Sequence, residues 1–206
     1  MPKKEVPLIK LADYLPEGTY EPVLHYLNFY KVHLTIAKSR DSILGDYRHQ
    51  IDTKNHRISV NGNLNKFAFL VTLLHELAHL LTYEKFGRRT QAHGREWKNI
   101  YGKILAQFIE KKVFPDDIEK ELQRTLNNPG ASTCAEVGLQ RILYQYDEKK
   151  NGHFLVEQIP DGKTFRISDG REFIKGPKRR TRYVCKEIST GKSFLFSGVY
   201  EVVMAE

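Results

Sequence analysis

The stretch His75-Glu76-Leu77-Ala78-His79 decides how this chain folds, because it lies inside its strongest helical pattern. Between Phe67 and Leu81 the apolar residues recur every three or four positions. This spacing predicts a helix with one apolar face. Asn63 or Asn65 is a suitable N-cap for the helix, and Gly87 is a suitable end.

On such a helix His75 and His79 lie one turn apart and about 40° apart around the axis. Both imidazoles can then bind one Zn²⁺ ion at roughly 2.0–2.1 Å. Glu76 is adjacent to the first histidine, and its carboxylate is placed to accept a proton from a water that the metal activates. The alternative is a pair of surface histidines beside a glutamate. It is disfavoured because Leu77 and Ala78 fall on the apolar stripe.

A catalytic zinc ion needs a third protein ligand and an open fourth position. The metzincin spacing requires a histidine six residues after His79, where this chain has Lys85. Two candidates remain in the next predicted helix. His93 stands at its start, beside Gly94, and Glu96 stands in its first turn. Spacing alone leaves both of them open.

The rest of the chain predicts an α+β protein in two parts. A second helix is expected from His93 or Gly94 to about Lys112, and a third, polar helix from Pro115. Strands are expected at 31–36, 44–51 and 56–61. Residues 113–139 have the character of a connector, and short β-type runs separated by turns follow. We expect domains at 1–128 and 129–206, the second a small antiparallel β module.

Composition excludes several classes of protein. Of the 206 residues 40% are apolar and 28% are charged, which predicts a folded chain with a real core. No apolar run is long enough for a transmembrane helix, and the start lacks the apolar segment of a secretory signal. The two cysteines, Cys134 and Cys185, are too few for a disulfide scaffold and fit a cytoplasmic protein.

Several segments resemble the SprT-like zinc metalloprotease family, which includes Spartan. The resemblance covers about residues 20–112 and continues more weakly beyond them. Its most specific part is the His-Glu-x-x-His pattern followed by a short insert and then His-Gly and an aromatic residue. The segments that carry it are His75–Leu81, His93-Gly94, Trp97, Ser39-Arg40, Leu44–Arg48 and Ile58–Asn61.

The resemblance implies a zincin-like (minigluzincin) core, in which a small antiparallel or mixed sheet packs against the His-Glu-x-x-His helix and the helix after it. It also implies one catalytic Zn²⁺, with His75, His79 and His93 as its ligands and Glu76 as the general base. His93 is thereby favoured over Glu96.

The C-terminal module departs from the family pattern. Many SprT-like proteins end in a zinc ribbon with paired cysteines, whereas only Cys185 stands in the corresponding region here. The segments Asp169–Phe173 and Gly176–Arg180 are similar to a subgroup without that metal. We therefore expect a ribbon-like or barrel-like sheet held by apolar packing.

Charge points to an anionic partner. The formal net charge is +8, and no acidic residue occurs between Phe173 and Lys186. Phe173 and Tyr183 flank these cations and are candidates for stacking on bases. The resemblance adds to this expectation, because SprT-like proteases act on proteins bound or crosslinked to DNA. The candidate nucleic-acid-binding residues are Lys175, Lys178, Arg179, Arg180 and Arg182.

Two functions follow from these patterns. The first is a zinc endopeptidase that acts on DNA-bound or DNA-crosslinked proteins, in the cytoplasm or at the nucleoid, as a DNA-repair enzyme. The alternative is a DNA-associated adaptor whose zinc is structural or weakly active, and Glu76 argues against it because a structural zinc needs no general base. The sequence contains no basic amphipathic helix, so a membrane partner is not expected. A substrate is expected to add as a strand to the sheet edge, at 44–51 or 56–61.

Overall fold

The computed structural model describes residues 8–40, 43–50, 55–126, 130, 137–148 and 151–205. The chain divides into an N-terminal unit, Met1–Asp147, and a C-terminal unit, Glu148–Glu206. The class is α+β, as predicted. Among the described helices, none has the length and apolar character needed to cross a membrane.

The N-terminal unit contains a sheet and a set of helices, and the expected strands and helices are present near their predicted positions. The bounds in chain order are η1 (Leu8–Tyr14), α1 (Tyr20–Phe29), β1 (His33–Ala37), β2 (Gly45–Arg48), β3 (Arg57–Asn61), α2 (Lys66–Phe86), η2 (Gly87–Arg89), α3 (Arg95–Glu110), α4 (Asp116–Thr125), α5 (Val137–Leu143) and η4 (Tyr144–Tyr146), where η marks a 3₁₀ helix.

Helix α2 begins and ends at capping residues that the sequence indicates. The side chain of Asn65 accepts a hydrogen bond from the Ala68 amide at 2.9 Å, which selects Asn65 over Asn63 as the N-cap. Gly87 ends the helix with a φ of 72°, a left-handed conformation that glycine adopts readily. The prediction of this helix is therefore confirmed at both ends.

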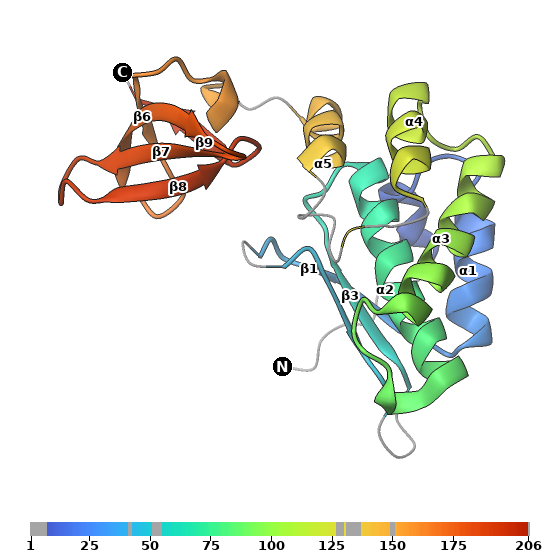
Figure 1. The fold of residues 1–206 in the computed structure, drawn as a ribbon. Coiled ribbons are helices and arrows are strands. Elements are labelled where there is room, and N and C mark those ends of the chain that lie inside the picture. Colours follow the sequence, from blue (N-terminus) through green and yellow to red (C-terminus); the bar gives the residue numbers. More distant parts are fainter. Residues whose placement is uncertain are drawn as a thin grey trace, which may run out of the picture. The chain divides into compact units, whose positions relative to one another are not determined.

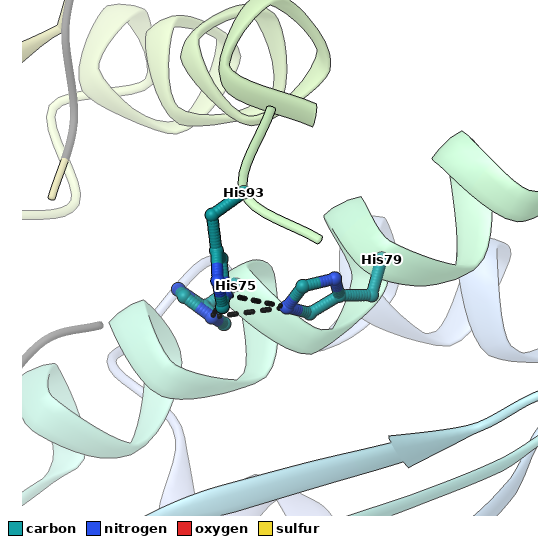
Figure 2. A group of neighbouring side chains, drawn as sticks. All are labelled: His75, His79 and His93. Carbon is teal, nitrogen blue, oxygen red and sulfur yellow. Dashed lines mark hydrogen bonds between the residues drawn. The ribbon is translucent and has the colours of Figure 1, made fainter. Parts of the chain in front are cut away.

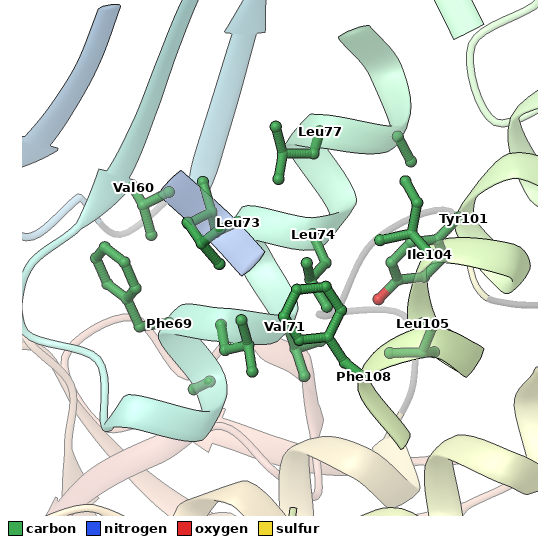
Figure 3. Close-up of a cluster of buried hydrophobic side chains, with 14 of the residues drawn as sticks. Val60, Phe69, Val71, Leu73, Leu74, Leu77, Tyr101, Ile104, Leu105 and Phe108 are labelled. Carbon is green, nitrogen blue, oxygen red and sulfur yellow. The ribbon is translucent and has the colours of Figure 1, made fainter. Parts of the chain in front are cut away.

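Burial of α2 extends beyond the predicted stripe. Phe69, Leu73 and Leu80 are also buried, because the sheet covers one side of α2 and other helices cover the opposite side. Figure 1 shows α2 between the strands and α3. Figure 3 shows part of the resulting core, with Val60 of β3 on one side of α2 and Phe108 of α3 on the other. A helix that is apolar on most sides belongs at the centre of a fold.

The three-stranded sheet is mixed, with the order β1-β3-β2. β1 runs parallel to β3, with Ile36 beside Val60, and β2 runs antiparallel to β3, with Gly45 beside Val60. β3 is the central strand and cannot accept another, so the second expected edge, 56–61, is wrong. β2, within the first expected range, is an edge strand and packs against α2.

Residues after α3 belong to the N-terminal unit rather than to a connector. α5 packs against α4, and the Asn65 side chain at the start of α2 donates to the Leu143 carbonyl at 2.9 Å and to Asp147 at 2.6 Å. The unit therefore continues to Asp147. The expected boundary between residues 128 and 129 lies outside the described residues.

The C-terminal unit is an antiparallel β module with its own core, which includes Phe165, Phe173 and Val202. Cys185 is buried in this core as a free thiol, and Cys134 lies outside the described residues. The sheet order is β4-β9-β5-β6-β7-β8. The bounds are β4 (His153–Leu155), η5 (Val156–Gln158), β5 (Thr164–Arg166), β6 (Glu172–Arg179), β7 (Arg182–Glu187), β8 (Ser193–Ser197) and β9 (Glu201–Met204).

Candidate metal centre

Three histidine side chains converge in the N-terminal unit (Figure 2). His75 and His79 come from successive turns of α2, and His93 comes from the segment just before α3. Their Nε2 atoms are 3.2 Å apart for His75 and His79, 3.1 Å for His75 and His93, and 2.9 Å for His79 and His93. Among the described residues these three form the one group whose ligand atoms are placed to share a metal ion.

Hydrogen bonding alone does not account for this triangle. Each Nε2 atom either carries a proton or offers a lone pair, so at most two of the three contacts can join a donor to an acceptor. A cation between the nitrogens would satisfy three lone pairs at once. Nitrogen ligands 2.0–2.1 Å from a tetrahedral ion lie about 3.3 Å from one another, close to the observed separations. The three residues therefore fit a metal such as zinc.

The protonation of these histidines also suits a metal. Burial first, and then the neighbouring His79 and His93, lower the pKa of His75 to about 3. Burial, followed by the charge of His93, lowers the pKa of His79 to about 4. The pKa of His93 is also lowered, by burial first and then by Lys98. At neutral pH these imidazoles are uncharged, which is the form that ligates metals.

His93 reaches the centre through an unusual backbone conformation. Its φ is 59°, in the left-handed region that few residues other than glycine adopt. Gly94 follows, and its amide donates to the Gln91 carbonyl at 3.0 Å, closing a tight turn. A Cβ atom at residue 94 would lie 3.0 Å from that carbonyl oxygen and 3.2 Å from Gln91 Cβ. The pair His93-Gly94 thus lets the chain turn sharply before α3.

Trp97 supports all three histidines. Its ring centroid lies 4.7 Å from that of His75, 5.3 Å from that of His79 and 4.7 Å from that of His93. Trp97 is fully buried, and the Tyr101 ring stacks on it with centroids 4.9 Å apart. Side chains that fix the orientation of ligands preorganise a metal site. The aromatic residue in the sequence pattern therefore has a structural role beside the ligands.

Glu76 lies in the interior beside the histidines, against the edge strand. Only 6% of the residue is exposed, and burial raises the pKa of its carboxyl to about 8. That pKa includes a smaller increase caused by the charge of Asp46 and a decrease caused by the positive charge of Arg40. A Cβ atom at Gly45 would lie 2.6 Å from Oε1 of Glu76, so β2 leaves space for this carboxylate only because residue 45 is glycine.

Sequence reasoning missed a chain of contacts beneath His79. The Tyr47 ring lies parallel to that of His79, with centroids 6.5 Å apart and planes 3° apart. The Tyr47 hydroxyl is 3.0 Å from Nδ1 of His56, and Nε2 of His56 is 3.2 Å from Glu84. These residues are distant in sequence, and no spacing rule connects them. Burial raises the pKa of Tyr47, so its hydroxyl keeps the proton that it donates to His56.

The alternative ligand Glu96 does not join the histidine cluster. Its Oε2 atom faces Gly94, 3.5 Å from where a Cβ of that residue would be. The acidic side chain in the first turn of α3 instead interacts favourably with the helix dipole. The structure thus brings together His75, His79 and His93 and leaves Glu96 apart from them.

The predicted nucleic-acid residues fall on the hairpin of β6 and β7 in the C-terminal unit. Lys178, Arg179, Arg180 and Arg182 are exposed there. Lys175 is different, because it is 5% exposed and its Nζ donates to the Ile159 carbonyl at 2.6 Å and pairs with Asp161 at 2.9 Å.

The prediction that Lys175 belongs to the nucleic-acid-binding set is therefore wrong, because its side chain points into the module. Side chains two apart on a strand share a face, so Lys175 follows Phe173 inward. Phe173 is fully buried, and it offers no surface on which a base could stack.

Comparison with known proteins agrees with this geometry. A sequence model of the SprT-like family matches residues 21–124, which is half of the chain and includes all three histidines. The chain belongs to the SprT-like family. A segment of 59 residues is 39% identical to Protein SprT of Glaesserella parasuis serovar 5 (strain SH0165), covering 29% of this chain and 36% of that protein. No solved structure matches the chain.

Proposed function

We propose that this SprT-like protein is a zinc-dependent endopeptidase with a zincin-like (minigluzincin) catalytic unit. The observation that carries the proposal is the convergence of the His75, His79 and His93 Nε2 atoms within 2.9–3.2 Å, beside a buried glutamate. Three protein ligands with an open fourth position are typical of catalytic zinc. Zinc, when bound, supplies a Lewis acid that polarises a carbonyl group and lowers the pKa of water to about 7.

Glu76 is the general base of this proposal. It follows the ligand His75 in α2, and its carboxylate is buried, so a proton that it accepts is kept away from bulk water. In the metal-free protein its pKa is raised to about 8. A divalent cation nearby stabilises a carboxylate, which shifts that pKa down toward the ionised form that a base requires.

Edge strand β2 is the expected docking place for the substrate backbone. It packs against α2 next to Glu76, and among the described residues no strand pairs with its outer side. Backbone hydrogen bonds to such an edge depend little on side chains. The proposal therefore includes cleavage of extended or unfolded segments with weak sequence preference.

Action on DNA-bound or DNA-crosslinked proteins is the finer part of the proposal. The exposed cations Lys178, Arg179, Arg180 and Arg182 support it, since they can neutralise phosphates from one hairpin. In this account Met1–Asp147 is the protease unit, Glu148–Glu206 is the DNA-associated module, and the protein works in the cytoplasm or at the nucleoid.

The test is cleavage of a DNA-binding protein by the zinc-loaded chain, with and without single-stranded DNA, beside Glu76→Gln. We expect cleavage that the substitution abolishes and that DNA stimulates. Equal cleavage with and without DNA would remove the DNA-directed part and keep the peptidase. If the zinc-loaded protein cleaves nothing in any lane, the proposed enzymatic function is contradicted and the DNA-associated adaptor is favoured.

A further inference from the structure

A groove of about 660 Å³ begins at the metal ligand His93 and follows α3 in the N-terminal unit. Its floor and walls come from one face of α3 and from the end of α4. The lining residues are His93, Gly94, Arg95, Lys98, Asn99, Gly102, Lys103, Ala106 and Leu126.

Small residues on α3 create this groove. Gly102 and Ala106 are four residues apart and so lie on one face of α3, and Gly94 directly precedes the helix. At Gly102 the end of α4 comes very close, and a Cβ atom there would lie 2.8 Å from the Leu126 carbonyl oxygen. From residue 94 to 106 a helix rises about 18 Å, which is the length of several residues of an extended chain.

The groove is positively charged along its length. Arg95 and Lys103 are exposed, and within the described part of the chain neither takes part in an ion pair. Lys98 lies between them in sequence and also lines the groove. None of the residues that line the groove is acidic, and the carboxylate of Glu96 lies beside its His93 end, with Oε2 3.5 Å from the Cβ position of Gly94. An occupant of this groove is therefore expected to carry negative charge.

We propose that this groove binds an acidic peptide segment of the substrate, beside the bond that is cleaved. The proposal rests on the proposed function, and it deepens that function by naming a class of substrate. Because the groove starts at His93, a chain that passes the metal centre can continue along α3. Aspartate and glutamate side chains then meet Arg95 and Lys103, while the apolar parts of the chain contact Ala106 and Leu126.

A peptide fits these features better than a nucleic acid does. Single-stranded nucleic acids are held by stacking of bases on aromatic side chains, and apart from the imidazole of His93 no aromatic ring lines this groove. Charge complementarity at a partly exposed site contributes selectivity more than affinity. The expected effect is a preference among substrates rather than tight binding.

Binding to the zinc-loaded Glu76→Gln variant of this 206-residue chain tests the proposal without requiring catalysis. Fluorescent peptides of equal length, with acidic, neutral or basic residues around one central sequence, are titrated at low salt and followed by anisotropy. We expect the acidic peptide to bind about fivefold more tightly than the neutral one, since two partly exposed charge pairs contribute. Adding Lys103→Glu should abolish this preference. Lys120→Glu on α4, an exposed lysine outside the groove, is the matched control and should retain it.

Each outcome decides the question. Equal binding of the three peptides, or a preference that Lys103→Glu does not change, would overturn the proposal. A short oligonucleotide is tested as a competitor. If it binds more tightly than the acidic peptide and its binding depends on Lys103, the proposal is overturned and the groove is assigned to nucleic acid. If the wild-type chain fails to cleave any protein, the proposed function fails, but this binding result stands separately.

Discussion

Gly45→Ala tests whether the edge strand positions the general base. A Cβ atom at residue 45 would lie 2.6 Å from Oε1 of Glu76, 2.9 Å from Cγ of Glu76 and 2.8 Å from Cγ2 of Thr72. Non-bonded carbon contacts are favourable at about 3.5–4.0 Å, so the carboxylate and the strand must separate by up to roughly 1 Å. Both neighbours are buried, which limits other ways of relieving the overlap.

The magnitude follows from two general effects. Overpacking of this kind lowers the free energy of unfolding by about 1–3 kcal/mol. Displacement of a catalytic group by about 1 Å lowers the rate roughly 100-fold. The three atoms nearest to the Cβ position of residue 45 belong to Glu76 and Thr72 and not to the ligands His75, His79 and His93, so zinc content should stay at the wild-type level. We therefore expect a folded, zinc-loaded protein with a large loss of turnover.

The assay measures peptide cleavage per bound zinc ion, together with urea unfolding. Gly62→Ala is the matched control, because its Cβ atom would lie 2.7 Å from Cγ2 of Ile36, away from Glu76. This control should lose similar stability without losing turnover. Full activity of Gly45→Ala, or an equal loss of activity in the two variants, would refute the positioning role of β2.

Three further outcomes follow. Folding raises the pKa of Glu76 from 4.5 to about 8, so the contribution of this carboxyl to the stability of the metal-free protein is lost as the pH rises through that range. Between pH 6 and pH 8 the free energy of unfolding of wild type, measured in urea, should fall by about 2–3 kcal/mol relative to that of Glu76→Gln. A constant difference between the two proteins would contradict the shift. Trp97→Phe should reduce zinc affinity at least tenfold in chelator competition while costing less than the roughly 3–5 kcal/mol of a truncation to alanine, and unchanged affinity would remove its supporting role. Lys175→Met should lower the free energy of unfolding of the C-terminal unit by about 1–3 kcal/mol, because it leaves the buried Ile159 carbonyl without its donor, and an unchanged melting curve would contradict that.

The sequence predicts those parts of the molecule that local rules control. The bounds of α2 follow to within two residues from the candidate caps Asn63 or Asn65 and from Gly87, because capping depends on neighbouring residues only. The spacing of His75 and His79 follows from the pitch of one helix. His93 could not be chosen over Glu96 by spacing, since its place depends on the left-handed turn before α3.

Features that depend on packing between distant segments are not accessible in this way. The approach of Gly45 to Glu76 and the contacts of Tyr47 with His56 exist only once the sheet packs on α2. The connector prediction missed α5 because this helix is only seven residues long and is held by packing on α4. The abundance of cations in this segment places Lys175 among the exposed ones. The alternation of side chains along the strand, counted from the buried Phe173, instead indicates an inward position for Lys175.

The claim that His75, His79 and His93 hold one metal ion is tested most directly by zinc stoichiometry in single variants. Purified wild type, His93→Ala and Glu96→Gln are loaded with zinc, dialysed against a weak chelator and analysed for metal content. The account predicts one zinc ion per chain in wild type and in Glu96→Gln, and loss of that zinc in His93→Ala. Retention by His93→Ala together with loss by Glu96→Gln would contradict it and make Glu96 the third ligand.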